Sequence, residues 1–404
     1  MNSPRKFALL FLIYIAITGN FRLLLAQNLP TLFTKVQRYS EFLNTPIAMA
    51  VAYDGNNRKF IVEQTGAIRI IESDILLSTN LINLKQELDD IEADNMEKGL
   101  QSLTFHPQFS SNGKFYVFYS GPTTTSGMDH KSVIAEYILT FIDNQWTISK
   151  GRKLLEVDAP TSHQTGGALA FGKDGMLFIG IGDGSNSVSE VKQSLAQDLN
   201  SFLGKILRID VNAAMPYAIP RDNPFLTQPN IKPEIWAYGF RNPHRFDIDS
   251  KTNLFFCTDN GLQCCEEINL IEKGKNYGWP IVEGNGTSAD TGKVTKAYYA
   301  PILVLNHSSD SFIIGGYFYH GNKFPKLHGK YIYSNNNGKL FYLEKKKKFG
   351  WLHGEIKNEG EAFNTKKYFI TGFGKDEEGE LYLLTSEGKG PRHGGVIFKF
   401  LNFE

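Results

Sequence analysis

A strand pattern recurs six times along this chain, and it limits the possible folds more than any other feature. Each copy has a run of alternating polarity, a turn with Gly or Asp, and a second run rich in aromatic residues. A unit of three or four such strands, apolar on both faces, cannot bury itself alone, and radial stacking of such units forms a β-propeller. The repeats therefore predict an all-β fold, a six-bladed β-propeller, with long inserted loops where the copies are widely spaced. The copies are MAVAYDGNNRKFIVEQTGAIRIIE, LTFHPQFSSNGKFYVFYS, LAFGKDGMLFIGIGDG, FDIDSKTNLFFCTDNG, GGYFYHGNKFPKLHGKYIYSNNNGKLFYLE and ITGFGKDEEGELYLLTSEG.

Composition agrees with this fold class and argues against one class of partner. The 404 residues include 38 Gly, and aromatic residues make up 13% of the chain, which suits short strands joined by tight turns. The formal net charge is +1, with no basic face or acidic tail, so the sequence predicts no nucleic acid partner. We expect one domain over residues 27–404.

The first residues of the chain have the features of an export signal. Arg5 and Lys6 precede an apolar run that begins at Phe7, and a small-residue cleavage site lies near Ala26. The run is short for a membrane-spanning helix, although an uncleaved anchor is the alternative. We therefore expect a signal peptide over residues 1–26, no membrane span in the mature chain, and a secreted or periplasmic location.

Polar residues in the loops between strands are the candidates for function, because propellers usually bind ligands at one mouth of the central channel. His163 lies in the loop TSHQTGG. A neutral imidazole is a suitable acceptor for the proton of an alcohol, but a lone histidine more often bonds a neighbouring backbone group and tethers a loop. Glu97, in NMEKGLQSLTFHP, either points into the channel as an acceptor or is a solvated loop charge.

A second candidate loop is YGFRNPHRF, which carries Arg241 and Asn242. The arginine offers a planar charged fork that suits carboxylates or quinone oxygens, and the asparagine both donates and accepts. The alternative is an arginine that ties two blades together. His244 and Arg245, which follow, are expected to be structural or to lie at the rim.

The third candidate is DNGLQCCEEINL. Calcium prefers oxygen ligands, and a glycine turn can expose consecutive carbonyls, here those of Gly261 and Leu262. Cys264 and Cys265 are adjacent and Cys257 lies close by; this is too few cysteines for a disulfide framework, and local pairing or buried thiols are both open.

These loops, in this order, resemble the glucose/sorbosone dehydrogenase family, which includes soluble quinoprotein aldose dehydrogenases and hedgehog-interacting-protein-like propellers. The resemblance implies a propeller that holds pyrroloquinoline quinone (PQQ) and calcium at the channel mouth. His163 would be the general base for the C1 hydroxyl of an aldose, while hydride moves to the quinone and then to an external electron acceptor. Arg241 and Asn242 would contact PQQ, and the carbonyls of Gly261 and Leu262 would hold calcium. The matching stretches, between about residues 40 and 400, are GLQSLTFHPQFSSNGKFYVFYS, HQTGGALAFGKDGMLFIGIGDG, LGKILRID, WAYGFRNPHRFDID, EEINLIEKGKNYGWP and FGKDEEGELYLL.

The chain departs from the pattern of the enzymes at several positions. Glu97 stands where glutamine is common, Asn336 where a cofactor-binding lysine is expected, and Leu262 where a proline is expected. The segment before the last repeat offers Lys366 and Lys367 but no arginine. The wording EEINL and KNYGW leans towards the hedgehog-interacting-like branch. Two functions therefore stay open: a sugar dehydrogenase that uses PQQ and calcium, and a non-catalytic propeller that binds carbohydrate or protein.

Overall fold

The computed structural model describes residues 29–93, 95–142, 145–185, 187, 190, 194–285, 287–288, 298–306, 312–347 and 350–404. The expected signal peptide, residues 1–26, lies outside the described residues. Within the described part, no helix is long and apolar enough to cross a membrane.

Strands dominate the described residues, as the repeats predict, and four of the sheets have four strands each. Each of these sheets follows the order of the chain, with antiparallel neighbours. The first contains β2 (Pro46–Val51), β3 (Lys59–Glu63), β4 (Ala67–Glu72) and β5 (Ile75–Asn83). The second contains β6 (Leu100–Phe105), β7 (Lys114–Gly121), β8 (His130–Ile142) and β9 (Gln145–Ala159). The third contains β10 (Gly166–Phe171), β11 (Leu177–Ile181), β12 (Lys205–Ile209) and β13 (Ile235–Tyr238). The fourth contains β14 (Pro243–Ile248), β15 (Phe255–Asn260), β16 (Cys265–Leu270) and β19 (Leu303–Asn306).

The last two repeats share one eight-stranded sheet, and this corrects the prediction of six separate blades. The sheet has the order β20-β21-β22-β23-β1-β26-β25-β24. Its strand β1 pairs in parallel with β23 and antiparallel with β26, so the N-terminal strand joins two repeats that would otherwise form separate sheets. The bounds are β1 (Leu32–Asn44), β20 (Ile313–Phe318), β21 (Tyr331–Asn335), β22 (Leu340–Lys346), β23 (Gly350–Asn358), β24 (Phe369–Lys375), β25 (Leu381–Ser386) and β26 (Gly394–Phe403).

The remaining elements are short. A ribbon of β17 (Val282–Glu283) and β18 (Thr287–Ser288) lies beyond the fourth sheet, and two single turns of helix are α2 (Phe109–Asn112) and η1 (Pro325–Leu327).

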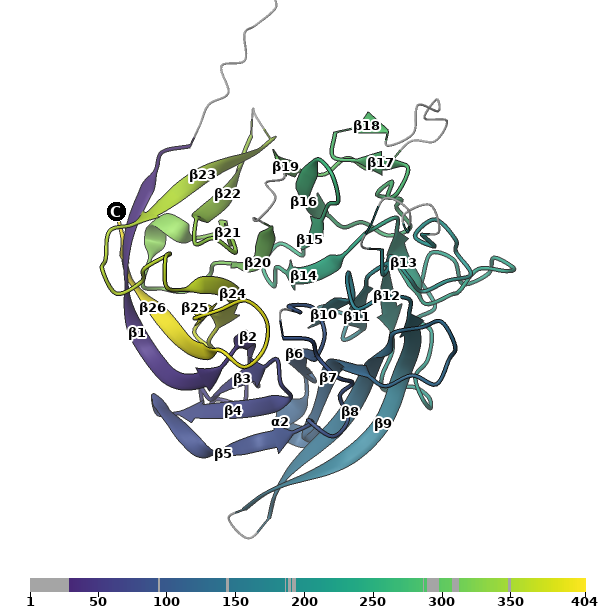
Figure 1. The fold of residues 1–404 in the computed structure, drawn as a ribbon, viewed down its shortest axis with the longest axis horizontal. Coiled ribbons are helices and arrows are strands. Elements are labelled where there is room, and N and C mark those ends of the chain that lie inside the picture. The colour runs from purple at the N-terminus through teal and green to yellow at the C-terminus, as the bar shows by residue number, and fades with distance from the viewer. Residues whose placement is uncertain are drawn as a thin grey trace, which may run out of the picture.

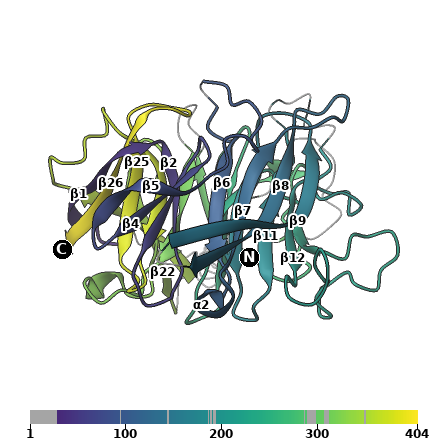
Figure 2. The same ribbon diagram turned by 90° about the horizontal axis from the view of Figure 1, so that it is seen from below.

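The first strand of each repeat lies at the centre of the molecule. Strands β2, β6, β10, β14, β20 and β24 contact one another in a closed ring, and Figure 1 shows them around the middle with the later strands towards the periphery. Figure 2 shows the molecule from the side, with β2 and β6 labelled and loops at both ends of the strands. The fold is therefore all-β and propeller-like.

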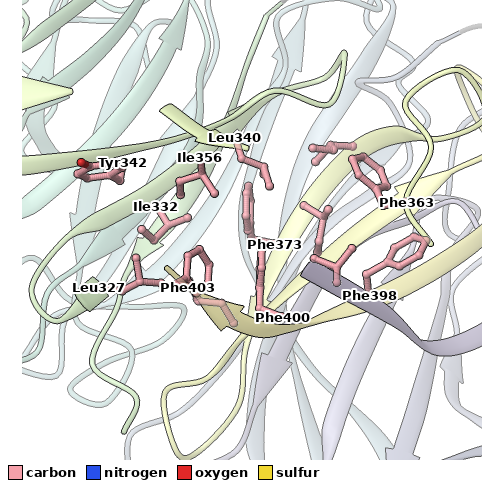
Figure 3. Close-up of a cluster of buried hydrophobic side chains, with 14 of the residues drawn as sticks. Leu327, Ile332, Leu340, Tyr342, Ile356, Phe363, Phe373, Phe398, Phe400 and Phe403 are labelled. Atoms are coloured by element: carbon pink, nitrogen blue, oxygen red, sulfur yellow. The ribbon is translucent and has the colours of Figure 1, made fainter. Parts of the chain in front are cut away.

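Hydrophobic clusters lie between neighbouring sheets and hold this ring together. One of them packs Leu340 and Ile356 against Phe373 and Phe398, between the two halves of the eight-stranded sheet (Figure 3). Equivalent clusters lie between the other neighbours around the ring. Because the apolar side chains are buried in these contacts between sheets, polar residues can occupy the axis and its loops.

Candidate functional site

A cavity of about 180 Å³, lined by both polar and apolar side chains, lies at one end of the ring axis. Glu97 and His163 reach it from the loops before β6 and β10, and Asn242 reaches it from the loop before β14. Asn260, at the end of β15, and Gln64, just after β3, also belong to the polar part of the wall. The structure therefore brings three of the predicted site residues, Glu97, His163 and Asn242, to one cavity.

Two glycines set the course of the loop that carries His163. Gly166 has φ +78°, and a Cβ there would lie 2.4 Å from the carbonyl oxygen of Gly180. Gly167 has φ +115°, and a Cβ there would lie 2.8 Å from Cβ of Gln101. Residues with side chains cannot adopt this backbone in this space, which explains the pair of glycines after HQT.

The side chain of His163 is half-buried, and its ring does not hold the loop in place. The backbone N–H of His163 donates to Oγ1 of Thr161 at 3.1 Å, and that hydroxyl in turn donates to the carbonyl of Gly184 at 2.7 Å. Among the described residues, no hydrogen bond is made by the imidazole ring. The loop is thus tethered through Thr161, and the ring of His163 is not needed for that purpose.

Glu97 belongs to the same loop contact. Its carboxylate accepts a hydrogen bond from the backbone N–H of Gln164, and its backbone carbonyl accepts from Oγ1 of Thr165 at 2.8 Å. Burial raises the pKa of Glu97, while the Gln164 N–H and the nearby charges of His163 and Arg241 act in the opposite direction. Glu97 is therefore a half-buried acceptor that positions the His163 loop, rather than a solvated charge.

Asp259 anchors the loop that carries Arg241 and Asn242. Its two carboxylate oxygens accept from the backbone N–H groups of Arg241 at 3.1 Å and Asn242 at 2.5 Å. Asn242 then accepts, through Oδ1, a hydrogen bond from the backbone N–H of Gly166 at 2.9 Å. This chain of contacts fixes the His163 loop to the Asn242 loop, so the two candidate loops hold a common geometry.

The guanidinium of Arg241 is bound by backbone carbonyls. Nη1 donates to the carbonyls of Gly261 at 2.7 Å and Asn260 at 3.2 Å, and Nη2 donates to that of Ser185 at 3.1 Å. The face of Trp279 lies 5.7 Å from the guanidinium carbon. The predicted calcium ligand Gly261 and the predicted cofactor ligand Arg241 therefore do converge, but they bind each other.

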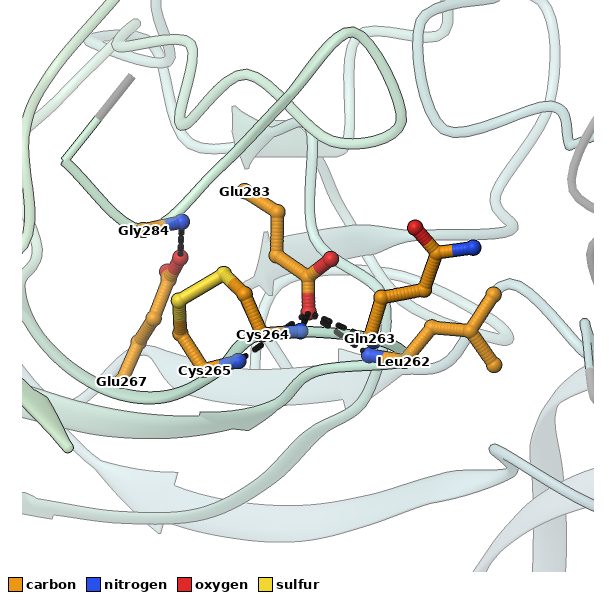
Figure 4. The surroundings of a disulfide bond; sticks show 7 residues. All are labelled: Leu262, Gln263, Cys264, Cys265, Glu267, Glu283 and Gly284. Atoms are coloured by element: carbon orange, nitrogen blue, oxygen red, sulfur yellow. Dashed lines mark hydrogen bonds between the residues drawn. A yellow bond between two sulfur atoms is a disulfide. The ribbon is translucent and has the colours of Figure 1, made fainter. Parts of the chain in front are cut away.

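The backbone N–H groups of the loop after Gly261 point at the carboxylate of Glu283 (Figure 4). Oε1 of Glu283 accepts hydrogen bonds from the backbone N–H groups of Leu262 at 2.8 Å and Gln263 at 3.1 Å, and also from those of Cys264 and Cys265. Cation ligands must offer oxygens, so this arrangement suits a carboxylate. Within the described ranges, no three His, Cys, Asp or Glu side chains are grouped to hold a metal ion. The guanidinium of Arg241 already donates to the Gly261 carbonyl, which disfavours a second cation there, and calcium binding by Gly261 and Leu262 stays a prediction.

The structure also shows the state of the three cysteines. Cys264 and Cys265 form a disulfide with each other, and Cys257 is a free, buried thiol. Local pairing, one of the two alternatives that the sequence left open, is therefore confirmed for the adjacent pair.

Asn336 lies outside the cavity wall. Its Oδ1 accepts from the backbone N–H of Phe312 at 3.1 Å, and its carbonyl accepts from the N–H of Ile370 at 3.1 Å. Phe312 itself lines the cavity. Asn336 thus supports one wall of the cavity from behind, and its role as a cofactor ligand stays a prediction.

His244 and Arg245, expected to be structural or to lie at the rim, both face the axial cavity. Both lie on β14, and both line the axial cavity. Arg245 also borders a second, smaller cavity further along the axis, so it forms part of the floor of the first. One feature of the sequence indicates that these two residues lie near the axis: they stand at the start of a repeat, where the inner strand begins.

A ring of inner strands around an axial cavity, closed by loops from every repeat, defines a β-propeller-like protein with a channel-mouth site. The family model described as "Glucose / Sorbosone dehydrogenase" matches residues 43–394, and the chain belongs to that family.

Relatives in this family include both enzymes and proteins named for binding. The chain is 29% identical to the human Hedgehog-interacting protein over 388 residues, which cover 91% of this chain and 52% of that protein. The soluble aldose sugar dehydrogenase of Escherichia coli, solved in the apo-form, has a TM-score of 0.71 at 24% identity and covers 92% of this chain and 99% of its own. A PQQ-bound aldose sugar dehydrogenase from Streptomyces coelicolor has a TM-score of 0.66 at 20% identity, covering 93% and 100%. The two solved structures support the fold. The chain spans 52% to 59% of the length of three curated relatives that are 28% to 29% identical to it.

The pKa of Glu267, a buried carboxyl next to Asp259, can be tested through the pH dependence of stability. It pairs in register with Asp259, and its carboxylate accepts from Nδ2 of Asn269 at 3.0 Å and the N–H of Gly284 at 2.7 Å. Burial raises the pKa of Glu267 to about 7 from 4.5. A carboxyl whose pKa is higher in the folded state stabilises the fold below its unfolded pKa, and this contribution is lost as the pH rises through about 7.

We therefore expect Glu267→Gln to flatten the fall in the free energy of unfolding between about pH 4.5 and pH 7. The free energy of unfolding of the wild type should fall by about 1–3 kcal/mol more than that of Glu267→Gln over that window. Urea unfolding at a series of pH values measures it, with the exposed Glu92→Gln as the matched control. Parallel pH profiles for the wild type and Glu267→Gln would contradict the shifted pKa.

Proposed function

We propose that this protein is an exported oxidoreductase that oxidises the C1 hydroxyl of aldose sugars or related alcohols at the axial cavity, with PQQ as the redox cofactor and His163 as the general base. The observation that carries the proposal is the free imidazole ring of His163 in a cavity that also contains Asn242 and Glu97. We also propose that the eight-stranded sheet serves as two blades of a six-bladed propeller. This is supported by the ring of six inner strands.

One side chain of the cavity wall favours an anionic cofactor, and another can accept a hydrogen bond from a hydroxyl group. Arg245 supplies a cation at the floor, and Asn260 Oδ1 is a buried acceptor with no hydrogen-bond partner among the described residues. PQQ, when bound, would supply the two-electron acceptor. Calcium at Gly261 and Leu262 is not part of the proposal, because Arg241 takes the carbonyl and Glu283 takes the amides.

Each residue then has a role that follows from its position. His163 accepts the proton of the C1 hydroxyl on its free ring nitrogen, as the C1 hydrogen leaves with its electron pair. Asn242 and Asn260 offer amide groups that suit sugar hydroxyls. Glu97 acts as a positioning residue, because its carboxylate holds the Gln164 N–H next to His163.

A second candidate, a non-catalytic propeller that binds carbohydrate or protein, is supported by two observations. The human Hedgehog-interacting protein covers 91% of this chain. In addition, the guanidinium of Arg241 is engaged by three carbonyls instead of being directed at a cofactor.

One experiment separates the two candidates. Purified protein is mixed with PQQ, and the cofactor absorbance and the reduction of a redox dye are followed with a panel of aldoses. The oxidoreductase proposal expects a protein-bound PQQ spectrum and dye reduction that depends on the sugar. A protein that binds sugars but leaves the dye oxidised with PQQ present would be a non-catalytic binder.

A further inference from the structure

Arg245 is a half-buried cation without a counter-ion among the described residues. Its guanidinium lies on the propeller axis, between the cavity that contains His163 and a second cavity of about 50 Å³. Nη1 donates to the carbonyl of its neighbour His244 at 3.0 Å, and Nη2 donates to that of Ile47 at 3.4 Å. Both acceptors are neutral, and no carboxylate within the described residues forms an ion pair with this guanidinium.

Three other arginines with little exposure form ion pairs, whereas Arg241 is held by backbone carbonyls, as Arg245 is. Arg58 forms an ion pair with Asp54 at 2.5 Å, Arg152 with Glu136 at 3.0 Å, and Arg208 with two aspartates. Burial lowers the pKa of Arg245 to about 10, so the side chain still carries its charge at neutral pH. A guanidinium that is partly removed from water and has no counter-ion can pair with an anion that enters the cavity.

The groups around Arg245 are polar and incompletely bonded. The ring of His244 is 8% exposed and faces the cavity, and the described residues form no hydrogen bond with it. Oδ1 of Asn260 lacks a partner as well. Glu97 is the one carboxylate in the cavity wall, and its oxygens are directed at Gln164. Tyr317, beneath Arg245 in the second cavity, contributes a neutral hydroxyl.

We propose that the axial cavity binds a small carboxylate, which Arg245 holds through its guanidinium while His244 and Asn260 contact hydroxyl or carbonyl groups of the same ligand. A planar guanidinium pairs with a carboxylate through two parallel hydrogen bonds, and a dry cavity strengthens that pair. The carboxylate belongs either to a sugar acid, such as a uronate, or to PQQ. The inference rests on the proposed function only in that both place a small molecule in this cavity.

The test compares a charged sugar with its neutral counterpart. Isothermal titration calorimetry measures the binding of D-galacturonate, D-galactose and PQQ to the wild type, Arg245→Gln and Arg245→Lys. The control is Arg221→Gln, which removes an exposed arginine. At least one of the two anions should lose about 10- to 100-fold in affinity in Arg245→Gln, with partial recovery in Arg245→Lys. Galactose should bind equally to all four proteins, and Arg221→Gln should match the wild type throughout.

The pattern of losses identifies the source of the carboxylate. Loss for galacturonate assigns the site to a sugar acid, and loss for PQQ alone assigns it to the cofactor. If both anions bind equally to the wild type and Arg245→Gln, the inference is wrong, whereas the proposed function stands on the binding of PQQ and galactose. If none of the three binds the wild type, both are wrong.

A second measurement on the wild type keeps the inference testable if Arg245→Gln does not fold. Phenylglyoxal modifies accessible arginines, and peptide mass spectrometry reports the modification of Arg245 itself. Galacturonate or PQQ should protect Arg245 from modification by about tenfold or more, while galactose and an equal concentration of sodium chloride should not. Modification that proceeds at one rate in all four solutions would contradict the inference.

Discussion

Replacing His163 with alanine is expected to lower the turnover of aldoses by about 10²–10⁴-fold, the usual contribution of a general base. The affinity for PQQ should change little, because the loop is held by Thr161, Glu97 and the glycines rather than by the imidazole ring. Steady-state assays with a redox dye give the turnover, and the cofactor absorbance gives the affinity.

The control for this substitution is another half-buried histidine. His353 lies on the outer strand β23, and its Nδ1 has no partner among the described residues. His353→Ala should therefore leave turnover unchanged. Full activity in His163→Ala would remove His163 from the base role, and loss of PQQ together with activity would assign it to binding instead.

The largest effect on stability is expected at Gly166. Alanine at this position needs φ +78° and would place its Cβ 2.4 Å from the Gly180 oxygen and 2.7 Å from the Gly182 nitrogen. Because all these atoms belong to the backbone, the loop or the β10–β11 pairing has to move. We expect a loss of about 3–5 kcal/mol in the free energy of unfolding, measured by urea titration with tryptophan fluorescence.

Gly175 gives a matched control within the same repeat. Its φ is +77°, but a Cβ there would meet nothing within 4 Å. Gly175→Ala should therefore cost only the strain of the left-handed backbone, about 1–2 kcal/mol. Equal losses for the two variants would mean that φ alone, and not the contact with Gly180, is what requires glycine at position 166.

The fold class could be predicted because it depends on a repeated local pattern. Strand, turn and aromatic strand recur at every blade, and the structure places those runs in the sheets that they predict. The role of β1 could not be predicted in the same way. It precedes the first copy, and its partners β23 and β26 lie at the other end of the sequence, so no local signal reports them.

The site was predictable where a loop carried unusual residues, as at His163 and Asn242. It was not predictable where the answer depended on which face of a strand points to the axis. Arg245 lies on a strand, and alternation alone does not distinguish the channel from the space between sheets. The contact of Arg241 with the Gly261 carbonyl was equally hidden, because it joins two loops whose approach exists only in the folded ring.

Strand β1 also determines when this molecule can become complete. Each four-stranded sheet can form as soon as its own stretch of chain has emerged from the ribosome, but β1 has to wait for β26. Until that last strand arrives, β1 and β25 each keep a row of unpaired backbone groups, which are templates for pairing with other chains. Closing a loop of nearly the whole chain is also slow. Aggregation should therefore compete with the pairing of β1 and β26, so substitutions that weaken β26 should lower the yield of folded protein.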